Sequence, residues 1–357
     1  MQSSPEPVDL TLQVVPRARF DVVDLRSRLA QPHCDALAPY LRCFYWSLHT
    51  TAGFFDRSFV ARLPRKHGVT GYVEAFKTIF PEGAGYEHDQ LDRRTDLAPG
   101  QREVEPKNAD SHLAFIASGL RTCVSYPNRA NEPVLFVDLD GVNEGRARQR
   151  ITRIIGYNKE EEVETLRIEV PVSSHPVDSI NLKDPRLGVY ERLQASIARH
   201  GIRKGRVRLS LQAAERQAGL AINEHETLLM RHDLAEVLRD PLRFAVEKGR
   251  HVLADPRAVP SKTLGYAQYD LVRIMNQVVD VLGLGHSRAE KIMARTLAFP
   301  LSRFFRMKRS VSLLVSSENG SDAPTIVEGT YQSPILVQWH RAPRQARIVD
   351  ATITRLR

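Results

Sequence analysis

The order of sequence patterns along this chain occurs twice, and this repetition constrains the fold more than any other feature. The stretch WSLHTTAGFF, at residues 46–55, ends an apolar, aromatic run with a histidine and two threonines. The stretch RLSLQAAERQAGLAINEHE, at residues 208–226, has the same apolar approach and the same Ala-Gly followed by a large apolar residue, but it lacks the His-Thr-Thr. A pattern that recurs at this separation predicts two structural units related by duplication.

The first half contains strand and helix patterns in a defined order. Alternation of apolar and polar residues predicts a strand at residues 10–15, and the aromatic run at residues 40–48 predicts another. The segment NADSHLAFIASGL, at residues 108–120, has a polar start and a glycine at its end, which is typical of a helix. The complete set of expected elements is strands at 10–15, 40–48, 132–139 and 148–155, and helices at 21–30 and 108–120.

After a charged run at residues 158–164, the order of patterns starts again. Asp184 and Pro185 predict the start of a helix, because proline is favoured in a first helical turn. The remaining expected elements are strands at 165–172, 205–212, 310–317, 333–339 and 347–356, and helices at 224–239, 266–283 and 287–299. We therefore expect an α+β fold of two repeats, each a mixed or antiparallel β-sheet sandwich with packed helices. The expected divisions are a leader at 1–8, repeats at 9–157 and 165–357, and a linker at 158–164.

Composition limits the classes of partner. The net charge of +9 favours anionic partners, which include phosphorylated metabolites, nucleic acid and acidic membranes. No apolar run approaches the ~20 residues that span a bilayer, and the N-terminus lacks the basic and apolar regions of a secretory signal. Three cysteines, none in a CxxC pair, suit a reducing compartment. We expect a cytoplasmic protein with no membrane partner, and we favour a basic solvated surface over a nucleic-acid footprint.

Three histidines of the first half are candidate metal ligands. They are His49 in LHTTAG, His88 in YEHD and His112 in NADSHL. Neutral imidazoles suit zinc and similar metals, and three of them with an open fourth position would make a catalytic type of site. Their spacing is not a local metal motif, so three independent histidines remain the alternative interpretation of the residues alone.

Hydroxyl and basic side chains form a candidate anion site. Thr50 and Thr51 follow the end of an expected strand, where hydroxyls and backbone N–H groups can hold an oxyanion or phosphate. Arginine binds phosphate through two N–H groups, and the expected hairpin that follows residue 138 offers Arg146, Arg148 and Arg150. An ordinary turn and a solvated loop of mixed charge are the alternatives.

The order of HTTAG, YEHD, NADSHL and a terminal strand pair with an acidic-Gly turn and arginines resembles the YjbQ family, over roughly residues 9–155. The opening RARFDVVDLRSRL is also similar to the start of that family, whose members are described as secondary thiamine-phosphate synthases. The resemblance implies a reaction that joins a pyrimidine pyrophosphate to a thiazole phosphate. A bound cation and basic groups would then neutralise the leaving pyrophosphate.

The second half resembles the family at complementary positions. QAGLAINEHETLLMRHDL is similar to the segment after the family's His-Thr and contains Asn223 and Glu224, and EGTYQSPILVQWHRAPRQARIV is similar to its Gly-Thr-Trp-Gln segment and contains Gln332. Because each half keeps what the other lacks, we predict one composite site. His49, His112 and Glu224 would be its catalytic residues, with Glu224 as general base or metal ligand. Ordinary surface or capping roles for the second-half residues are the alternative.

The favoured hypothesis is an enzyme that performs a metal-assisted reaction on a phosphorylated small molecule. It would use zinc or magnesium bound by His49, His88 and His112. The expected substrate contacts are Thr50, Thr51, Asn108, Arg146, Arg148, Arg150, Asn223 and Gln332. The rival hypothesis is a non-catalytic module for small-ligand binding or assembly, which the erosion of motifs in both copies would fit. We also expect a homo-oligomer, and the resemblance implies a trimer.

Overall fold

The computed structural model describes residues 5–63, 65–143, 145–239, 244, 247, 307–317 and 323–357. The helices expected at 266–283 and 287–299 lie outside the described residues. Within the described part of the chain, every strand pair is antiparallel and the helices are few, so the predicted α+β class is confirmed. No helix among these residues is both long enough and apolar enough to cross a bilayer.

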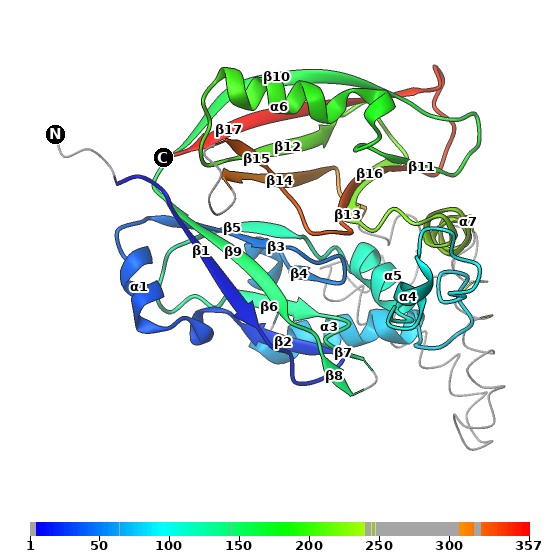
Figure 1. Cartoon of the computed structure of the whole chain (residues 1–357), viewed down its shortest axis with the longest axis horizontal. Helices are drawn as coiled ribbons and strands as arrows, with labels where there is room; N and C mark the ends of the chain where they lie inside the picture. Colours follow the sequence, from blue (N-terminus) through cyan, green and yellow to red (C-terminus); the bar gives the residue numbers. More distant parts are fainter. Residues whose placement is uncertain are drawn as a thin grey trace, which may run out of the picture. The chain divides into compact units, whose positions relative to one another are not determined.

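The first half forms two main sheets and a small hairpin (Figure 1). The larger sheet has the order β1 (Val8–Val14), β9 (Arg150–Tyr157), β3 (Arg42–Ser47), β5 (Cys123–Pro127). The smaller sheet has the order β2 (Asp21–Asp24), β6 (Leu135–Asp138), β4 (Ala52–Phe54), and the hairpin consists of β7 (Val142–Asn143) and β8 (Arg146–Ala147). A short 3₁₀ turn, η1 (Arg26–Arg28), and the helix α1 (Gln31–Leu37) connect β2 to β3.

The second half repeats this strand order. Its larger sheet runs β10 (Glu160–Pro171), β17 (Ala346–Leu356), β12 (Gly205–Leu211), β14 (Ser310–Ser317), β15 (Pro324–Val327). Its smaller sheet runs β11 (Asp178–Asn181), β16 (Ser333–Gln338), β13 (Ala218–Asn223). A 3₁₀ turn, η2 (Pro185–Leu187), precedes the helix α6 (Val189–Arg199), and the Asp184 carboxylate accepts a hydrogen bond from the Arg186 amide as expected for a helix start.

The strand registers place the two Ala-Gly pairs at equivalent positions. Ala52 of β4 lies opposite Asp138 of β6, and Ala218 of β13 lies opposite Gln338 of β16. In both cases the partner is the last residue of its strand. The similarity between the two Ala-Gly stretches therefore coincides with matched places in the two small sheets.

The chain divides into two compact units, and each half contributes to both. The sheet unit contains residues 1–57, 120–225 and 307–357, and the helical unit contains residues 58–119 and 226–306. The described helices of the helical unit are α3 (Arg65–Ile79), α4 (Pro99–Arg102), α5 (Ala109–Ser118) and α7 (Leu234–Arg239), with a π-helical turn, η3 (Leu229–Asp233), before α7; the short helix α2 (Arg57–Val60) lies at the division. The helical unit is thus assembled from the β4–β5 and β13–β14 connections.

Strand β3 explains why the halves of the sheet unit fold together. Successive side chains of a strand point to opposite faces, and β3 is buried on both. Phe44 and Trp46 belong to a core that both halves share, whereas Cys43 and Tyr45 belong to a core made by the first half alone. Burial on both faces explains the uninterrupted apolar run in the sequence, and each fully buried large side chain contributes roughly 1.5–3 kcal/mol.

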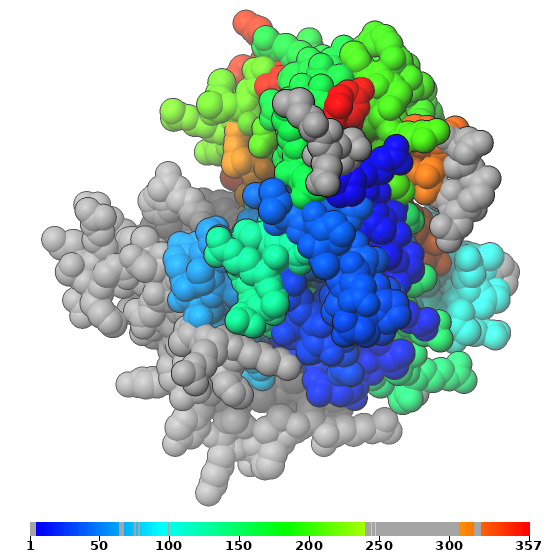
Figure 2. Space-filling model, turned by 90° about the vertical axis from the view of Figure 1, so that its left-hand side faces the viewer, coloured from blue at the N-terminus to red at the C-terminus, as the bar shows by residue number. Residues whose placement is uncertain are grey.

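Polar contacts also join the halves of the sheet unit near the N-terminus. The Asp9 carboxylate of β1 accepts hydrogen bonds from Arg153, from Lys204 at 2.7 Å and from Ser316 at 2.5 Å. Burial raises the pKa of Asp9, but these three donors outweigh burial and the pKa lies below its ordinary value. Figure 2 shows the N-terminal segment (blue) against the green and red surface of the second half.

The prediction of a helix at residues 21–30 is wrong, because this segment forms β2 and the turn η1. Val22 and Val23 are β-branched and pair with β6, which outweighs the helical spacing of the apolar residues. The Asp24 carboxylate then accepts the amide hydrogen of Arg26, which turns the chain.

The charged run at residues 158–164 is largely part of β10 rather than a loop. Its glutamates lie opposite β17 residues and also pair with basic side chains, as in the ion pair between Glu160 and Arg206 at 2.6 Å. The repeat boundaries expected on either side of this run stay a prediction.

Candidate metal centre

Helix α5 carries His112 into the interior of the helical unit. All ten residues of α5 are buried, and they include the polar side chains of Asp110, Ser111, His112 and Ser118. The Asp89 carboxylate accepts a hydrogen bond from the Ala109 amide at 3.0 Å, at the first turn of the helix. Gly119 ends the helix in the left-handed region, with φ of 79°. Both ends of α5 are thus defined, and His112 is 1% exposed.

His88 lies in the loop between α3 and α4, and a carboxylate from the second half holds this loop. The backbone N–H groups of Glu87 and His88 donate to the two carboxylate oxygens of Asp233, at 3.0 and 2.9 Å. Asp233 is the last residue of η3 and is fully buried. The two segments of the helical unit therefore meet at His88, which is itself 0% exposed.

Glu226 determines which nitrogen of His88 is available. The His88 Nδ1 lies 2.9 Å from the Glu226 carboxylate, which also accepts the amide hydrogens of Leu228 and Leu229. Burial raises the pKa of Glu226, but the hydrogen bonds from His88, Leu228 and Leu229 outweigh it and the pKa is lowered. An ionised carboxylate at this distance requires a proton on Nδ1, so the neutral imidazole has its lone pair on Nε2.

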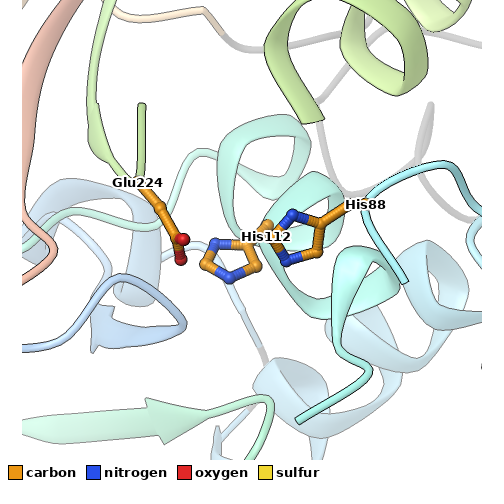
Figure 3. A group of neighbouring side chains, drawn as sticks. All are labelled: His88, His112 and Glu224. Carbon is orange, nitrogen blue, oxygen red and sulfur yellow. The ribbon is translucent and has the colours of Figure 1, made fainter. Parts of the chain in front are cut away.

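The imidazoles of His88 and His112 lie side by side (Figure 3). Their ring centroids are 5.2 Å apart, their planes are inclined at 73°, and a ring nitrogen of each lies within 4.8 Å of the other. Two nitrogen ligands of one zinc ion lie at most ~4.2 Å apart, twice the zinc–nitrogen distance of ~2.1 Å. The limit of 4.8 Å is close to this span, so the two imidazoles are candidate ligands of one ion.

Further charges surround the two histidines within the helical unit. The buried Arg94 guanidinium lies 3.4 and 3.5 Å from the two ring nitrogens of His88, and it pairs with Asp96 and Glu105. Burial raises the pKa of the Tyr86 phenol, and the nearby carboxylates of Asp110, Asp233 and Asp89 raise it further. The histidines thus lie near both carboxylates and a guanidinium group, whose charges act in opposite directions on a bound cation.

His49, the third expected metal ligand, belongs to the sheet unit. Its Nε2 accepts a hydrogen bond from the Ile151 amide at 2.8 Å. Burial, together with the positive charges of Arg150 and Arg148, lowers the pKa of His49 to about 3. The imidazole is therefore neutral near pH 7 and carries its proton on Nδ1. Among the described residues, the group of side chains that could hold a metal ion includes His88 and His112 but not His49.

The arginines expected to bind an anion are engaged by neighbouring groups. Arg150 is buried and donates to both carboxylate oxygens of Asp138 at 2.7 Å, to the Asp140 carbonyl and to the Thr51 hydroxyl. Arg148 pairs with the Asp140 carboxylate. Arg146 is exposed on β8. Thr51 is thus a partner of Arg150 in the interior.

The structure brings two second-half residues to the His49 segment. The Asn223 side chain donates to the Thr50 carbonyl at 3.0 Å, and the Gln332 side chain donates to the His49 carbonyl at 2.9 Å. Glu224, labelled in Figure 3, directly follows β13 and precedes Glu226 by two residues. Its amide donates to the Asn223 side chain. Asn108 is buried immediately before α5.

Sequence patterns did not identify Glu226, Asp233, Arg94 or Asp89 as site residues. Glu226 lies in the segment NEHE, and its position two residues after Glu224 is a weak signal. Its contact with His88 joins residues separated by 138 positions, and Asp233 reaches Glu87 over 146 positions. Such long-range pairs follow from the packing of α5 and η3, which periodicity does not specify.

No family model and no curated protein matches this chain. Several solved structures are similar over about half of it. A "YbjQ-like protein of unknown function" from Sulfolobus solfataricus P2 is 15% identical, with 55% of this chain and 99% of that chain covered and a TM-score of 0.28. A hypothetical protein from Aeropyrum pernix K1 is 17% identical, with 54% and 98% covered and a TM-score of 0.27. An uncharacterized conserved protein of the yjbq/upf0047 family from Clostridium acetobutylicum is 14% identical, with 53% and 98% covered and a TM-score of 0.26.

Proposed function

We propose that this protein is a metal-dependent enzyme acting on a phosphorylated small molecule, with a divalent ion bound by His88 and His112. The observation that carries the proposal is the contact between the His88 Nδ1 and the Glu226 carboxylate, beside the His112 imidazole. A carboxylate on the second nitrogen is the usual companion of a metal-ligating histidine, because it sets the tautomer and the ring orientation. Imidazole donors favour zinc over magnesium, which prefers oxygen.

The residues around the histidines would keep the two imidazoles in a binding-competent arrangement. Glu226 holds the proton of His88 on Nδ1, and Asp233 holds the backbone of the loop. A divalent ion bound there would stabilise negative charge on a phosphate or pyrophosphate oxygen. The role expected for Glu224, as general base or third metal ligand, stays a prediction.

Metal binding is tested by elemental analysis and by cobalt titration of the protein after chelation and reloading. We expect about one zinc ion per chain, lost in His88→Ala and His112→Ala, and an affinity lowered about 10- to 100-fold in Glu226→Gln. His175 is exposed, so His175→Ala is the matched control and should retain the ion. Full zinc content in both His88→Ala and His112→Ala would contradict the proposal. Glu224→Gln decides in the same assay whether Glu224 is a ligand.

The reaction is tested separately, on the zinc-loaded protein. The resemblance of the first-half motifs points to transfer of a pyrimidine pyrophosphate to a thiazole phosphate, so release of pyrophosphate from this pair of substrates is the first assay. Turnover that disappears in His112→Ala and persists in His175→Ala supports the enzyme. Zinc binding without turnover on phosphorylated substrates would favour the non-catalytic binding module instead.

The pairing of Arg148 and Arg150 with aspartates favours that second candidate, because these guanidinium groups already have anionic partners. An association with other copies of the chain, expected as a trimer, applies to both candidates. Sedimentation of the zinc-loaded protein measures it.

A further inference from the structure

Arg94 is a buried cation beside the candidate metal centre, and the proposed function gives it no role. It belongs to the helical unit, as do His88 and His112. Among residues 92–98 and 100–104, Arg94 and Leu97 are buried and all the others are exposed. The Arg94 side chain is 0% exposed. An otherwise exposed segment therefore carries one full positive charge into the interior of this unit.

One guanidinium nitrogen of Arg94 lies over a face of the His88 imidazole. Its Nη1 atom is 3.5 Å from Nδ1 and 3.4 Å from Nε2 of the ring. An atom in the plane of the ring at these two distances would overlap the ring carbons, so Nη1 lies above that plane. The lone pair with which Nε2 binds a metal points outward within the plane. The cation thus lies close to the ligand atom but outside the direction in which a metal would bind.

Carboxylates hold the guanidinium group in this place. Asp96 accepts hydrogen bonds from Nε at 3.2 Å and from Nη2 at 2.5 Å, and Glu105 lies 3.4 Å from Nη1. The Asp96 side chain is 44% exposed, whereas that of Arg94 is fully buried. Water therefore screens the negative charge of Asp96 more than it screens the positive charge at His88.

A divalent ion on His88 would lie close to this positive charge. The zinc–nitrogen distance is ~2.1 Å, and Nη1 lies 3.4 Å from Nε2, so the ion and Nη1 would be less than about 6 Å apart. Like charges at such a distance inside a protein repel one another strongly, and salt screens the repulsion little. The guanidinium group therefore opposes the ion that the two imidazoles attract.

We propose that Arg94 sets the metal affinity of the centre: its guanidinium group weakens binding of the divalent ion by His88 and His112, so that the ion exchanges with the solution. This inference rests on the proposed function, which supplies the ion. It adds a form of regulation to the same centre. Occupancy, and with it activity, follows the free concentration of the divalent ion.

A purely structural role for Arg94 predicts a change of the opposite sign. If the guanidinium group only anchored its segment, its loss would loosen the neighbouring loop that carries His88 and would weaken metal binding. If its charge opposes the ion, its loss strengthens metal binding. The direction of the change in affinity therefore separates the two roles.

The first measurement is the zinc affinity of the full-length, reloaded protein at pH 7, by competition with a fluorescent zinc chelator. We expect Arg94→Gln to bind zinc about 10- to 100-fold more tightly, because a nearby buried charge is removed. Arg94→Lys keeps the charge and should not gain affinity. Arg93→Gln is the matched control: Arg93 is adjacent, 48% exposed and paired with Glu87, so this variant should bind like wild type. Unchanged or weaker binding in Arg94→Gln overturns the inference.

Asp96→Asn tests the same charges without removing the buried arginine. It leaves the guanidinium group less neutralised and should weaken zinc binding about 3- to 10-fold. The double variant Arg94→Gln/Asp96→Asn should then bind zinc more tightly than Asp96→Asn alone, which loosening of the segment would not produce. Wild-type affinity in Asp96→Asn, or a further loss in the double variant, contradicts the role of charge.

The rate of zinc loss into excess EDTA measures exchange directly. We expect Arg94→Gln to lose zinc more slowly than wild type and Arg93→Gln to lose it at the wild-type rate. Wild-type protein that holds no zinc after reloading overturns the proposed function and this inference with it. Zinc that binds to wild type but is neither tighter nor slower to leave in Arg94→Gln overturns this inference alone.

Discussion

Arg150 and Arg347 lie at equivalent places in the two halves, yet different partners neutralise them. Arg150 opens β9 and pairs with Asp138, at the end of β6. Arg347, near the start of β17, contacts Gln338 at the matching end of β16, and its carboxylate partner is Glu215. The carboxylate that pairs with the arginine lies at a strand end in the first half and in a turn in the second half. A buried arginine therefore needs a carboxylate nearby, but the fold does not prescribe which element supplies it.

The two turns between the large and small sheets differ in the same way. The second-half turn, at residues 212–217, is anchored to β17 by its own carboxylate: Glu215 accepts the Ile348 amide hydrogen and pairs with Arg347. The first-half turn, at residues 48–51, contains no carboxylate and is held from outside by Gln332 and Asn223. A turn supported from outside leaves its own side chains available for other roles.

The largest expected effect tests the placement of the two charges. Asp138→Ala leaves Arg150 buried without a carboxylate and should lower the free energy of unfolding by about 3–5 kcal/mol. Glu215→Ala should lower it by only about 1–3 kcal/mol, because Arg347 retains contacts with the carbonyls of Arg216 and His340. Denaturant titration at pH 7 measures both.

The double variant Asp138→Ala/Arg150→Met is the control for this comparison. It removes both charges and should recover much of the stability lost in the single variant, because no unpaired guanidinium remains buried. Equal losses in Asp138→Ala and Glu215→Ala would show that the two arginines are supported equally.

The next effect concerns pH, because only the first-half turn contains a histidine. Burial and the nearby arginines lower the pKa of His49 from 6.5 to about 3 in the folded protein. A base with a lowered folded pKa stabilises the fold above its unfolded pKa, and this stability is lost as the pH falls. Wild type should therefore lose stability between pH 6.5 and about 3, by up to ~1.4 kcal/mol per pH unit.

His49→Gln should remove this part of the pH dependence, whereas Glu215→Ala should keep it. The measurement is the denaturation midpoint across this pH range. A slope in His49→Gln that matches wild type would mean that protonation of other groups dominates.

The smallest effect concerns the contact between the halves at Asp9. Hydrogen bonds from Arg153, Lys204 and Ser316 lower the pKa of this carboxyl in spite of burial. The stability that it contributes is present above its unfolded pKa of 3.8 and is lost as the pH falls through the lower folded pKa. Asp9→Asn should lower the free energy of unfolding by about 1 kcal/mol at pH 7, and its difference from wild type should shrink in acid. A difference that is constant with pH would contradict this account.

Several elements could be predicted from the sequence because local pattern and tertiary environment agree. The aromatic run of β3, the alternation in β12 and the Gly119 end of α5 are all observed where they were expected. The helix prediction for residues 21–30 failed because the strand pairing of residues 21–24 with β6 outweighed their helical spacing. The residues at 160–164 form the start of β10 in spite of their charge, because charged residues on a strand can pair with basic neighbours.

The candidate centre was predictable only in part. The expected proximity of His88 and His112 came from motif order, and their rings are adjacent. The contacts of Glu226 and Arg94 with His88 depend on how loops pack, which no spacing in the chain encodes. Gln332 was recognised as a residue near His49, but its action through backbone carbonyls was visible only in three dimensions.

The position of β17 within its sheet has a consequence for synthesis of the chain. This strand lies between β10 and β12, although both precede it in sequence by more than 130 residues. While the chain leaves the ribosome, β10 and β12 therefore expose unsatisfied edges until β17 emerges. Such edges are templates for wrong pairing with other chains. The protein should accordingly depend on chaperones that shield nascent strands, and slow translation before residue 346 should increase its aggregation.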